Sequence, residues 1–452
     1  MIGVFFVIPP VKATLVVMLG AEMFLPVGPE FHIPWVPALD RYNLPYVCIL
    51  IGCLLRCPGR VTKLPKEKWF LFLTFLALLG GAFTGWTNGD TITFGASGEV
   101  VIPAMTFKDG MFVGISEFFP SYLAFYLGYV IFRGPKEVED LLAGLGIAGL
   151  VYCPFAIIEM RMSPQFNYWI YGYTTGQFLQ TIRWGGYRPM VFMPHGLALA
   201  RFFMVTTLAL FVLAKSRRTL LGLPVRLLAW YNATILVLCR STGAIVMVLV
   251  GILFVSLSSP KRQLLLATVL AVGTIAYPVL RASGVFPVSE LLDAAGALQE
   301  DRADSLAYRF KNEDLLLAHA RERILFGWGT YNRNRVFDSE GRDMTVTDGL
   351  WIIELGMTGA VGFLVVFGAL AWPVVWARHR LRKYGDRRER QNLTGLALIV
   401  ALVAVDLIPN GLWGVYVYLV AGVLVRQLRD LGTRSNPVPP QGPADIGLSV
   451  AS

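Results

Sequence analysis

The feature that most constrains this chain is a series of about a dozen apolar stretches that contain few charged residues. They cover residues 13–27, 43–55, 69–87, 111–132, 141–158, 196–214, 227–238, 242–256, 264–280, 349–375, 393–408 and 412–424. A helix of about 20 apolar residues crosses the hydrocarbon layer of a bilayer and satisfies its own backbone hydrogen bonds there. We therefore predict an all-α, polytopic integral membrane protein with about 12 transmembrane helices.

Composition and charge agree with this prediction. Of the 452 residues, 55% are hydrophobic and 15% are charged, whereas about 25% are charged in an average soluble protein. The net charge of +10 does not indicate nucleic-acid binding, because the basic residues gather in alternate connecting segments. The richest of these segments are 56–68, 215–226, 378–390 and 426–434. Since basic residues favour the cytoplasmic side, both termini are predicted to be cytoplasmic.

Two segments on the predicted outer side are too long to be simple turns. They cover residues 161–195 and 281–348, and the second carries signals for a short helix after Pro287 and a longer one over residues 304–322. The predicted organisation is therefore N-terminal membrane helices over 1–160, an outer aromatic loop over 161–195, central membrane helices over 196–280, a large helical periplasmic loop over 281–348, C-terminal membrane helices over 349–428 and a disordered cytoplasmic tail over 429–452.

The outer segments contain more arginine than the distribution of positive charge predicts. Acidic residues share the second segment, so many of these arginines are expected to form surface pairs, and Arg309 with Glu313, one helical turn apart, fits such a pair. Arg188 and Arg240 differ, because each adjoins a membrane helix without an acidic neighbour in sequence. A guanidinium in that position is suited to hold a phosphate, and phosphate on the outer side is expected to arrive on a lipid.

The first outer segment is aromatic. Nine aromatic residues fall within 166–192, and they indicate either an interfacial belt or a surface on which carbohydrate rings stack. His195 is interpreted as a helix-end histidine bonded to a backbone carbonyl. The four histidines are scattered, the five cysteines lie in or beside apolar stretches, and no nucleotide-binding motif is present, so neither a metal nor a cofactor is expected.

Four pieces of the chain together resemble a known family. They are YRPMVFMPHGLALARF (187–202), CRSTGAIVMVLVG (239–251), the predicted outer helix with Arg309, and ILFGWGTYNRNRV (324–336) followed by TVTDGLWIIELGMTGAVG (345–362). Their order resembles that of the O-antigen ligase and O-antigen polymerase superfamily, which are glycosyltransferases of the bacterial envelope. The resemblance covers residues 188–362.

The resemblance implies a metal-independent, inverting transfer in the bacterial inner membrane, at a site that faces the periplasm. A glycan leaves undecaprenyl diphosphate and joins a hydroxyl of a polysaccharide or lipid acceptor, in exopolysaccharide or O-antigen biosynthesis. Membrane lipid and other polysaccharide assembly proteins are the implied partners. In that family, arginines of the outer loops bind the diphosphate, and the resemblance implies the same role for Arg188 and Arg309.

One position departs from the family pattern. A histidine commonly precedes the last group of spans, whereas this chain has Asp348 followed by Gly349. Asp348 fits a general base, which the acceptor hydroxyl needs, and equally a helix N-cap. The predicted catalytic residues are thus Asp348, Arg188 and Arg309, and the predicted substrate-binding residues are Arg240, Arg321, Trp184, Tyr187 and Glu354.

A transporter or flippase for lipid-linked glycans, or a polysaccharide export subunit, is the alternative. A carrier is expected to have basic residues along a path through its spans. Arg201 is the one arginine clearly inside a predicted span, and this asymmetry favours an enzyme. The reaction is expected to be either polymerisation or ligation, and the presence of Asp348 in place of the family's histidine favours polymerisation.

Overall fold

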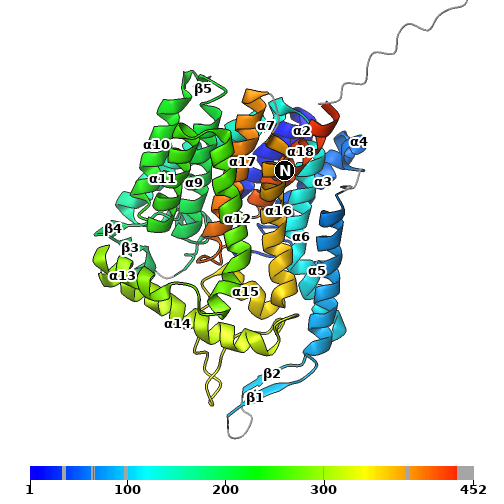
Figure 1. The fold of residues 1–452 in the computed structure, drawn as a ribbon, viewed down its shortest axis with the longest axis vertical. Coiled ribbons are helices and arrows are strands. Elements are labelled where there is room, and N and C mark those ends of the chain that lie inside the picture. Colours follow the sequence, from blue (N-terminus) through cyan, green and yellow to red (C-terminus); the bar gives the residue numbers. More distant parts are fainter. Residues whose placement is uncertain are drawn as a thin grey trace, which may run out of the picture.

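The structure is a computed structural model, and it describes residues 1–32, 37–62, 65, 67–95, 100–176, 178–298, 300–382 and 386–434. It is helical, as predicted, with three short two-stranded hairpins in the connecting segments (Figure 1). The final helix continues to residue 434, so the first residues of the predicted tail are helical, and residues 435–452 lie outside the described part.

The helices of the first half are α1 (Val4–Val7), α2 (Pro10–Phe24), α3 (Leu44–Arg56), α4 (Pro58–Val61), α5 (Lys68–Thr87), α6 (Phe107–Ile131), α7 (Pro135–Met162), α8 (Phe166–Tyr171) and α9 (Gly196–Leu213). Those of the second half are α10 (Val225–Leu238), α11 (Thr242–Leu257), α12 (Pro260–Ala282), α13 (Val288–Leu298), α14 (Glu300–Glu322), α15 (Leu350–Met357), α16 (Gly359–Leu381), α17 (Arg387–Asp406) and α18 (Tyr416–Arg434). The antiparallel pairs are β1 (Ile92–Phe94) with β2 (Val100–Ile102), β3 (Ile182–Arg183) with β4 (Gly186–Tyr187), and β5 (Thr219–Leu220) with β6 (Leu223–Pro224).

Five of the helices in the described residues, namely α5, α7, α9, α12 and α16, are long and apolar enough to cross a membrane. Helices α3, α10 and α11 are apolar but shorter. Each apolar stretch predicted from the sequence overlaps a helix. The protein is therefore a helical, membrane-embedded protein.

The predicted helix over 349–375 is divided into α15 and α16. Thr358 separates them, and Gly359, the first residue of α16, has a φ of +71°, which favours glycine. The chain that follows α14 runs against this break, because the amides of Ala360 and Val361 donate to the carbonyls of Ile324 (2.7 Å) and Leu325 (3.2 Å). The break depends on that tertiary contact, so hydropathy along the sequence does not reveal it.

Helix α9 is the centre of the bundle. All but one of its 18 residues are buried, and it packs against α7, α10, α11 and α17. A helix that is apolar around its whole circumference is typical of such a position. The N-terminal end of α9 is consequently held on several sides, and the residues that precede it are fixed with it.

Hairpins β1–β2 and β3–β4 and helices α13 and α14 gather at one end of the bundle, which we name the α14 end (Figure 1). Hairpin β5–β6 and helix α4 lie at the opposite end. Both of the long segments predicted to face outward, 161–195 and 281–348, are therefore at the α14 end.

Glycines bring α5 and α6 into close contact. Gly81 and Gly85 of α5 face Gly110 and Gly114 of α6, and each pair is spaced by four residues, as in membrane helices that pack through small residues. A Cβ atom added to Gly114 would lie 3.0 Å from Cα of Gly81. No side chain larger than hydrogen fits there without separating the helices.

We expect Gly114→Val to lower the free energy of unfolding by about 1–3 kcal/mol more than Gly273→Val does, because overpacking forces the two backbones apart. The control residue, Gly273, lies within α12, and a Cβ added there has no atom within 4 Å, so both variants carry the same change in helix propensity. Thermal unfolding in detergent, followed by tryptophan fluorescence, measures the difference. Equal stabilities would contradict the close approach of α5 and α6.

Candidate functional site

Most arginines at the α14 end are paired with carboxylates. Arg281 bonds Asp314 (2.6 Å), Arg333 and Arg323 both bond Asp90 (3.0 and 2.9 Å), and others are paired within the loop after α14. Pairing within the segment is therefore confirmed for Arg281, Arg335 and Arg342, whereas Asp90, the partner of Arg323 and Arg333, lies outside it. Arg281 and Arg333 are buried rather than solvated. These ion pairs hold the segments of the α14 end together.

The predicted pair between Arg309 and Glu313 is wrong. The Glu313 carboxylate instead accepts hydrogen bonds from Tyr277 (3.1 Å) and Trp351 (3.2 Å) and pairs with Arg281 (3.3 Å). Glu313 is buried where α14 packs on α12 and α15, and burial raises the pKa of its carboxyl despite these donors. Three tertiary partners thus replace the single helical neighbour, and they fix α14 on the bundle.

Arg309 pairs with Asp348, so the structure brings two of the predicted catalytic residues together. The guanidinium Nε lies 3.4 Å from Oδ2 of Asp348, and the two side chains are 32% and 40% exposed. Arg309 Nη1 also donates to the carbonyl of Pro409 (3.5 Å). The pair is thus open to solvent and available to a ligand.

Asp348 is not a side-chain cap. The N-cap of α15 is Gly349, which has no side-chain hydrogen bond, whereas the Asp348 carbonyl accepts a bond from the amide of Gly411. The carboxylate is directed to Arg309 instead. The helix-cap interpretation of Asp348 is therefore wrong, and the interpretation as a base stays a prediction.

Arg188 is a buried cation, only 8% exposed. Nη2 donates to the carbonyl of Arg240 (3.2 Å), while Nε has no hydrogen-bond partner. No carboxylate in the described part of the chain lies within ion-pair distance of it. Burial, and then the positive charges of Arg183 and Arg309, lower the pKa of Arg188 to about 10. A buried donor without a partner in a charged side chain indicates a place for an anion.

His195 is the N-cap of α9. Its Nδ1 accepts the amide N–H of Leu197 (3.1 Å), so it bonds a backbone amide and not the predicted carbonyl. Burial and the charges of Arg188, Arg183 and Arg309 lower the pKa of His195 to about 4, which leaves the ring neutral at pH 7. The charges of Arg183 and Arg309 therefore act on both Arg188 and His195, and we name Arg183, Arg188 and Arg309 the arginine cluster.

Arg240 supports the cluster instead of facing a ligand. Its guanidinium donates to the carbonyls of Arg183 and Trp184 (3.1 Å to the latter), which holds the β3–β4 turn over the end of α10. Arg240 itself has a φ of +57°, an uncommon conformation for a residue with a side chain. Its carbonyl is the one that Arg188 bonds. The predicted substrate-binding Arg240 is thus a scaffold for Arg188.

The other predicted residues are spread over a wider area. Trp184 is half-exposed at the β3–β4 turn, and the Tyr187 ring lies 6.1 Å from that of Phe178. Arg321 donates to the carbonyl of Ala282 (2.6 Å) and lies about 18 Å along α14 from Arg309. Glu354 is buried and accepts the hydroxyl of Thr358 (2.9 Å). Arg321 and Glu354 are therefore structural in these contacts.

Arg183 belongs to the cluster but was not assigned a role from the sequence. It lies five residues before Arg188, across a two-residue turn, and both end up at the same side because β3 pairs with β4. The hairpin signal was weak, since Trp-Gly at the turn is not a strong turn dipeptide and each strand has two residues. Because β3 pairs with β4, two arginines that are five residues apart in sequence come to lie near each other.

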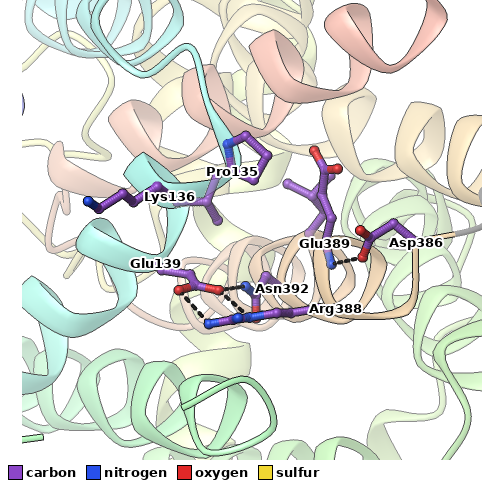
Figure 2. Close-up of a pocket in the computed structure, with 9 residues that line it drawn as sticks. Pro135, Lys136, Glu139, Asp386, Arg388, Glu389 and Asn392 are labelled. Carbon is purple, nitrogen blue, oxygen red and sulfur yellow. Dashed lines mark hydrogen bonds and ion pairs between the residues drawn. The ribbon is translucent and has the colours of Figure 1, made fainter. Parts of the chain in front are cut away.

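A separate pocket of about 400 Å³ lies at the opposite end, where α7 and α17 begin (Figure 2). Arg388 there is already paired with Glu139 through two bonds of 2.7 and 2.9 Å. Asp386 caps α17 by accepting the amide of Glu389 (2.9 Å). Lys136 is the other cation of this pocket, and the two cations share its lining with three carboxylates, those of Glu139, Asp386 and Glu389, so the pocket differs from the arginine cluster in charge. Within the described residues, no group of three or more His, Cys, Asp or Glu side chains is arranged to hold a metal ion.

Comparison with known proteins adds no relative: no family model matches the chain, and no curated protein matches it.

We expect Arg188→Ala to raise the pKa of His195 from about 4 towards 6.5, because the variant removes a positive charge that disfavours the imidazolium and admits water. Nuclear magnetic resonance of protein labelled with ¹³C-histidine measures this, since the chain has four histidines. Arg321→Ala, at the far end of α14, is the control and is expected to leave the value unchanged. Equal titration curves in both variants would refute the arginine cluster.

Proposed function

We propose that this protein is a membrane glycosyltransferase that transfers or polymerises a glycan from undecaprenyl diphosphate onto an acceptor hydroxyl, in the manner of the O-antigen ligase and polymerase superfamily. The observation that carries the proposal is Arg188, a buried guanidinium without an acidic partner in the described residues, beside two further arginines. The resemblance of residues 188–362 to that superfamily supports the same activity.

The arginine cluster suits a diphosphate. Guanidinium groups bind phosphate oxygens through two parallel hydrogen bonds and do not lose their proton at neutral pH. Arg188 supplies a buried charge, and Arg309 supplies one that is about one-third exposed. As the bond to the glycan breaks, negative charge grows on the leaving diphosphate, and both side chains stabilise it without a metal ion.

The pair of Arg309 and Asp348 suggests how binding prepares the base. A diphosphate that binds Arg309 competes with the 3.4 Å contact to Asp348 and frees the carboxylate. The freed carboxylate accepts the proton of the acceptor hydroxyl while that oxygen bonds the anomeric carbon. The bond from this carbon to the diphosphate breaks, its electron pair remains on the leaving oxygen, and the configuration is inverted.

This activity fits a location in the bacterial inner membrane with the α14 end towards the periplasm. The basic segments 56–68, 215–226 and 378–390 connect helices at the other end, which suits the cytoplasmic side. We propose about 12 spans and cytoplasmic termini on the same grounds. The lipid carrier then approaches the arginine cluster from the outer leaflet.

A carrier or flippase is the second candidate, and the charges inside the bundle bear on it. Arg201 of α9 and Asp406 of α17 are buried and lie 3.5 Å apart. A translocation path requires polar groups that a substrate can reach, whereas these two charges neutralise each other within the core. Arg188 and the two arginines beside it lie at one end instead, which favours chemistry there over passage through the bundle.

We expect Arg188→Ala to lower transfer by about 10²- to 10³-fold, as for loss of one well-directed donor, and Asp348→Asn to lower it by about 10²- to 10⁴-fold, as for loss of a general base. The assay uses purified full-length protein with a lipid-diphosphate glycan and an acceptor, followed by product analysis on gels. Arg342→Ala removes an exposed, paired arginine of the same end and serves as the control. Full transfer by both Arg188→Ala and Asp348→Asn would disprove the assignment.

A deletion strain distinguishes polymerisation from ligation. We expect single lipid-linked repeat units to accumulate, because Asp348, which stands where the family commonly has a histidine, favours polymerisation. Mass spectrometry of extracted lipid-linked glycans measures their length. Accumulation of long lipid-linked chains would instead indicate a ligase, and a normal lipid-linked pool would count against either activity.

A further inference from the structure

A single buried carboxylate organises the loop that carries Arg188. Glu159, near the end of α7, is 1% exposed. Its Oε1 accepts the amides of Gln165 (3.1 Å) and Phe166 (3.0 Å), and its Oε2 accepts those of Met190 (2.8 Å) and Val191 (2.7 Å). The same side chain therefore fixes the beginning of the aromatic loop and its end, two and three residues after Arg188.

The backbone held by Glu159 is strained. Val191 has a φ of +55°, and a β-branched residue rarely adopts this left-handed conformation. Such a conformation persists only where surrounding contacts determine it, and such residues concentrate at functional sites. The neighbouring residue is fixed as well, because the amide of Phe192 donates to Tyr152 (3.1 Å) and its carbonyl accepts from Arg41 (2.8 Å).

This turn determines where Arg188 lies. Pro189 is the only residue between Arg188 and the amides that Glu159 holds, and the amide of Arg188 donates to the carbonyl of Thr181 (2.6 Å). The guanidinium reaches the carbonyl of Arg240 from this fixed backbone. A carboxylate is suited to the task because it has two acceptor oxygens and no donor, whereas an amide side chain has one acceptor oxygen.

We propose that Glu159 is a positioning residue: by holding the strained turn at Met190 and Val191, it keeps the Arg188 guanidinium in place for the diphosphate. This inference rests on the proposed function, which supplies the diphosphate. Glu159 acts through Arg188 and does not itself contact the anion.

The test measures binding of inorganic pyrophosphate to the full chain in lipid nanodiscs by isothermal titration calorimetry. We expect Glu159→Gln to weaken binding by roughly 10-fold, in the range found when a supporting partner of a binding residue is removed. Glu159→Asp keeps two acceptor oxygens and is expected to recover part of the affinity. Glu139→Gln, at the other end of the same helix, is the matched control and should bind as the unmodified protein does.

A double-mutant cycle with Arg188→Ala separates positioning from general disruption of the fold. If Glu159 acts through Arg188, then Glu159→Gln causes no further loss of affinity in the Arg188→Ala background. A further loss of similar size there would overturn the inference, as would unchanged binding by Glu159→Gln alone. Absence of pyrophosphate binding by the unmodified protein would overturn the proposed function and this inference with it, so the two failures are distinguishable.

Discussion

The structure depends on one constraint, the high free-energy cost of removing a charged group from water. An apolar bundle has no solvent to stabilise an ion, so each buried charge needs a partner. Arg201 has Asp406, Arg281 has Glu313 and Asp314, and Glu159 has four backbone amides. Arg188 and Arg41 instead donate to backbone carbonyls, and the Nε of each has no hydrogen-bond partner. Of these two arginines, Arg188 is the one whose neighbours include Arg183 and Arg309, and this grouping of positive charge gives the α14 end its chemical character.

The site combines two segments that are distant in sequence. The loop between α7 and α9 supplies Arg183 and Arg188, whereas α14 supplies Arg309 and the end of the segment before α15 supplies Asp348. Each segment is fastened to the bundle by a buried carboxylate, Glu159 for the loop and Glu313 for α14. These two carboxylates fix the backbones that carry the arginines, so the site has a fixed geometry except at the exposed ends of a few side chains.

The sequence predicts most of the helices, because hydropathy alone defines an apolar segment of the required length. It also predicts that the large outer segments share one end, since the distribution of basic residues alternates. It does not predict the break at Gly359, the partner of Arg309 or the four bonds of Glu159. Each of these depends on a backbone or side chain that is close only in the folded chain. Asp348 illustrates the difference, because the sequence allowed a cap and a base, and the contact with Arg309 exists only after α14 has packed.

The glycine contact between α5 and α6 has a consequence at the α14 end. Thr84 and Asn88, at the end of α5, donate to the carbonyls of Phe326 (2.5 Å) and Gly327 (2.9 Å), just beyond the last turn of α14. The absence of side chains on Gly85 and Gly110 sets the distance between α5 and α6 at this end, next to Thr84 and Asn88, which hold the segment that follows α14. Side-chain volume at a contact between two helices thus influences the position of a segment more than 200 residues further along the chain.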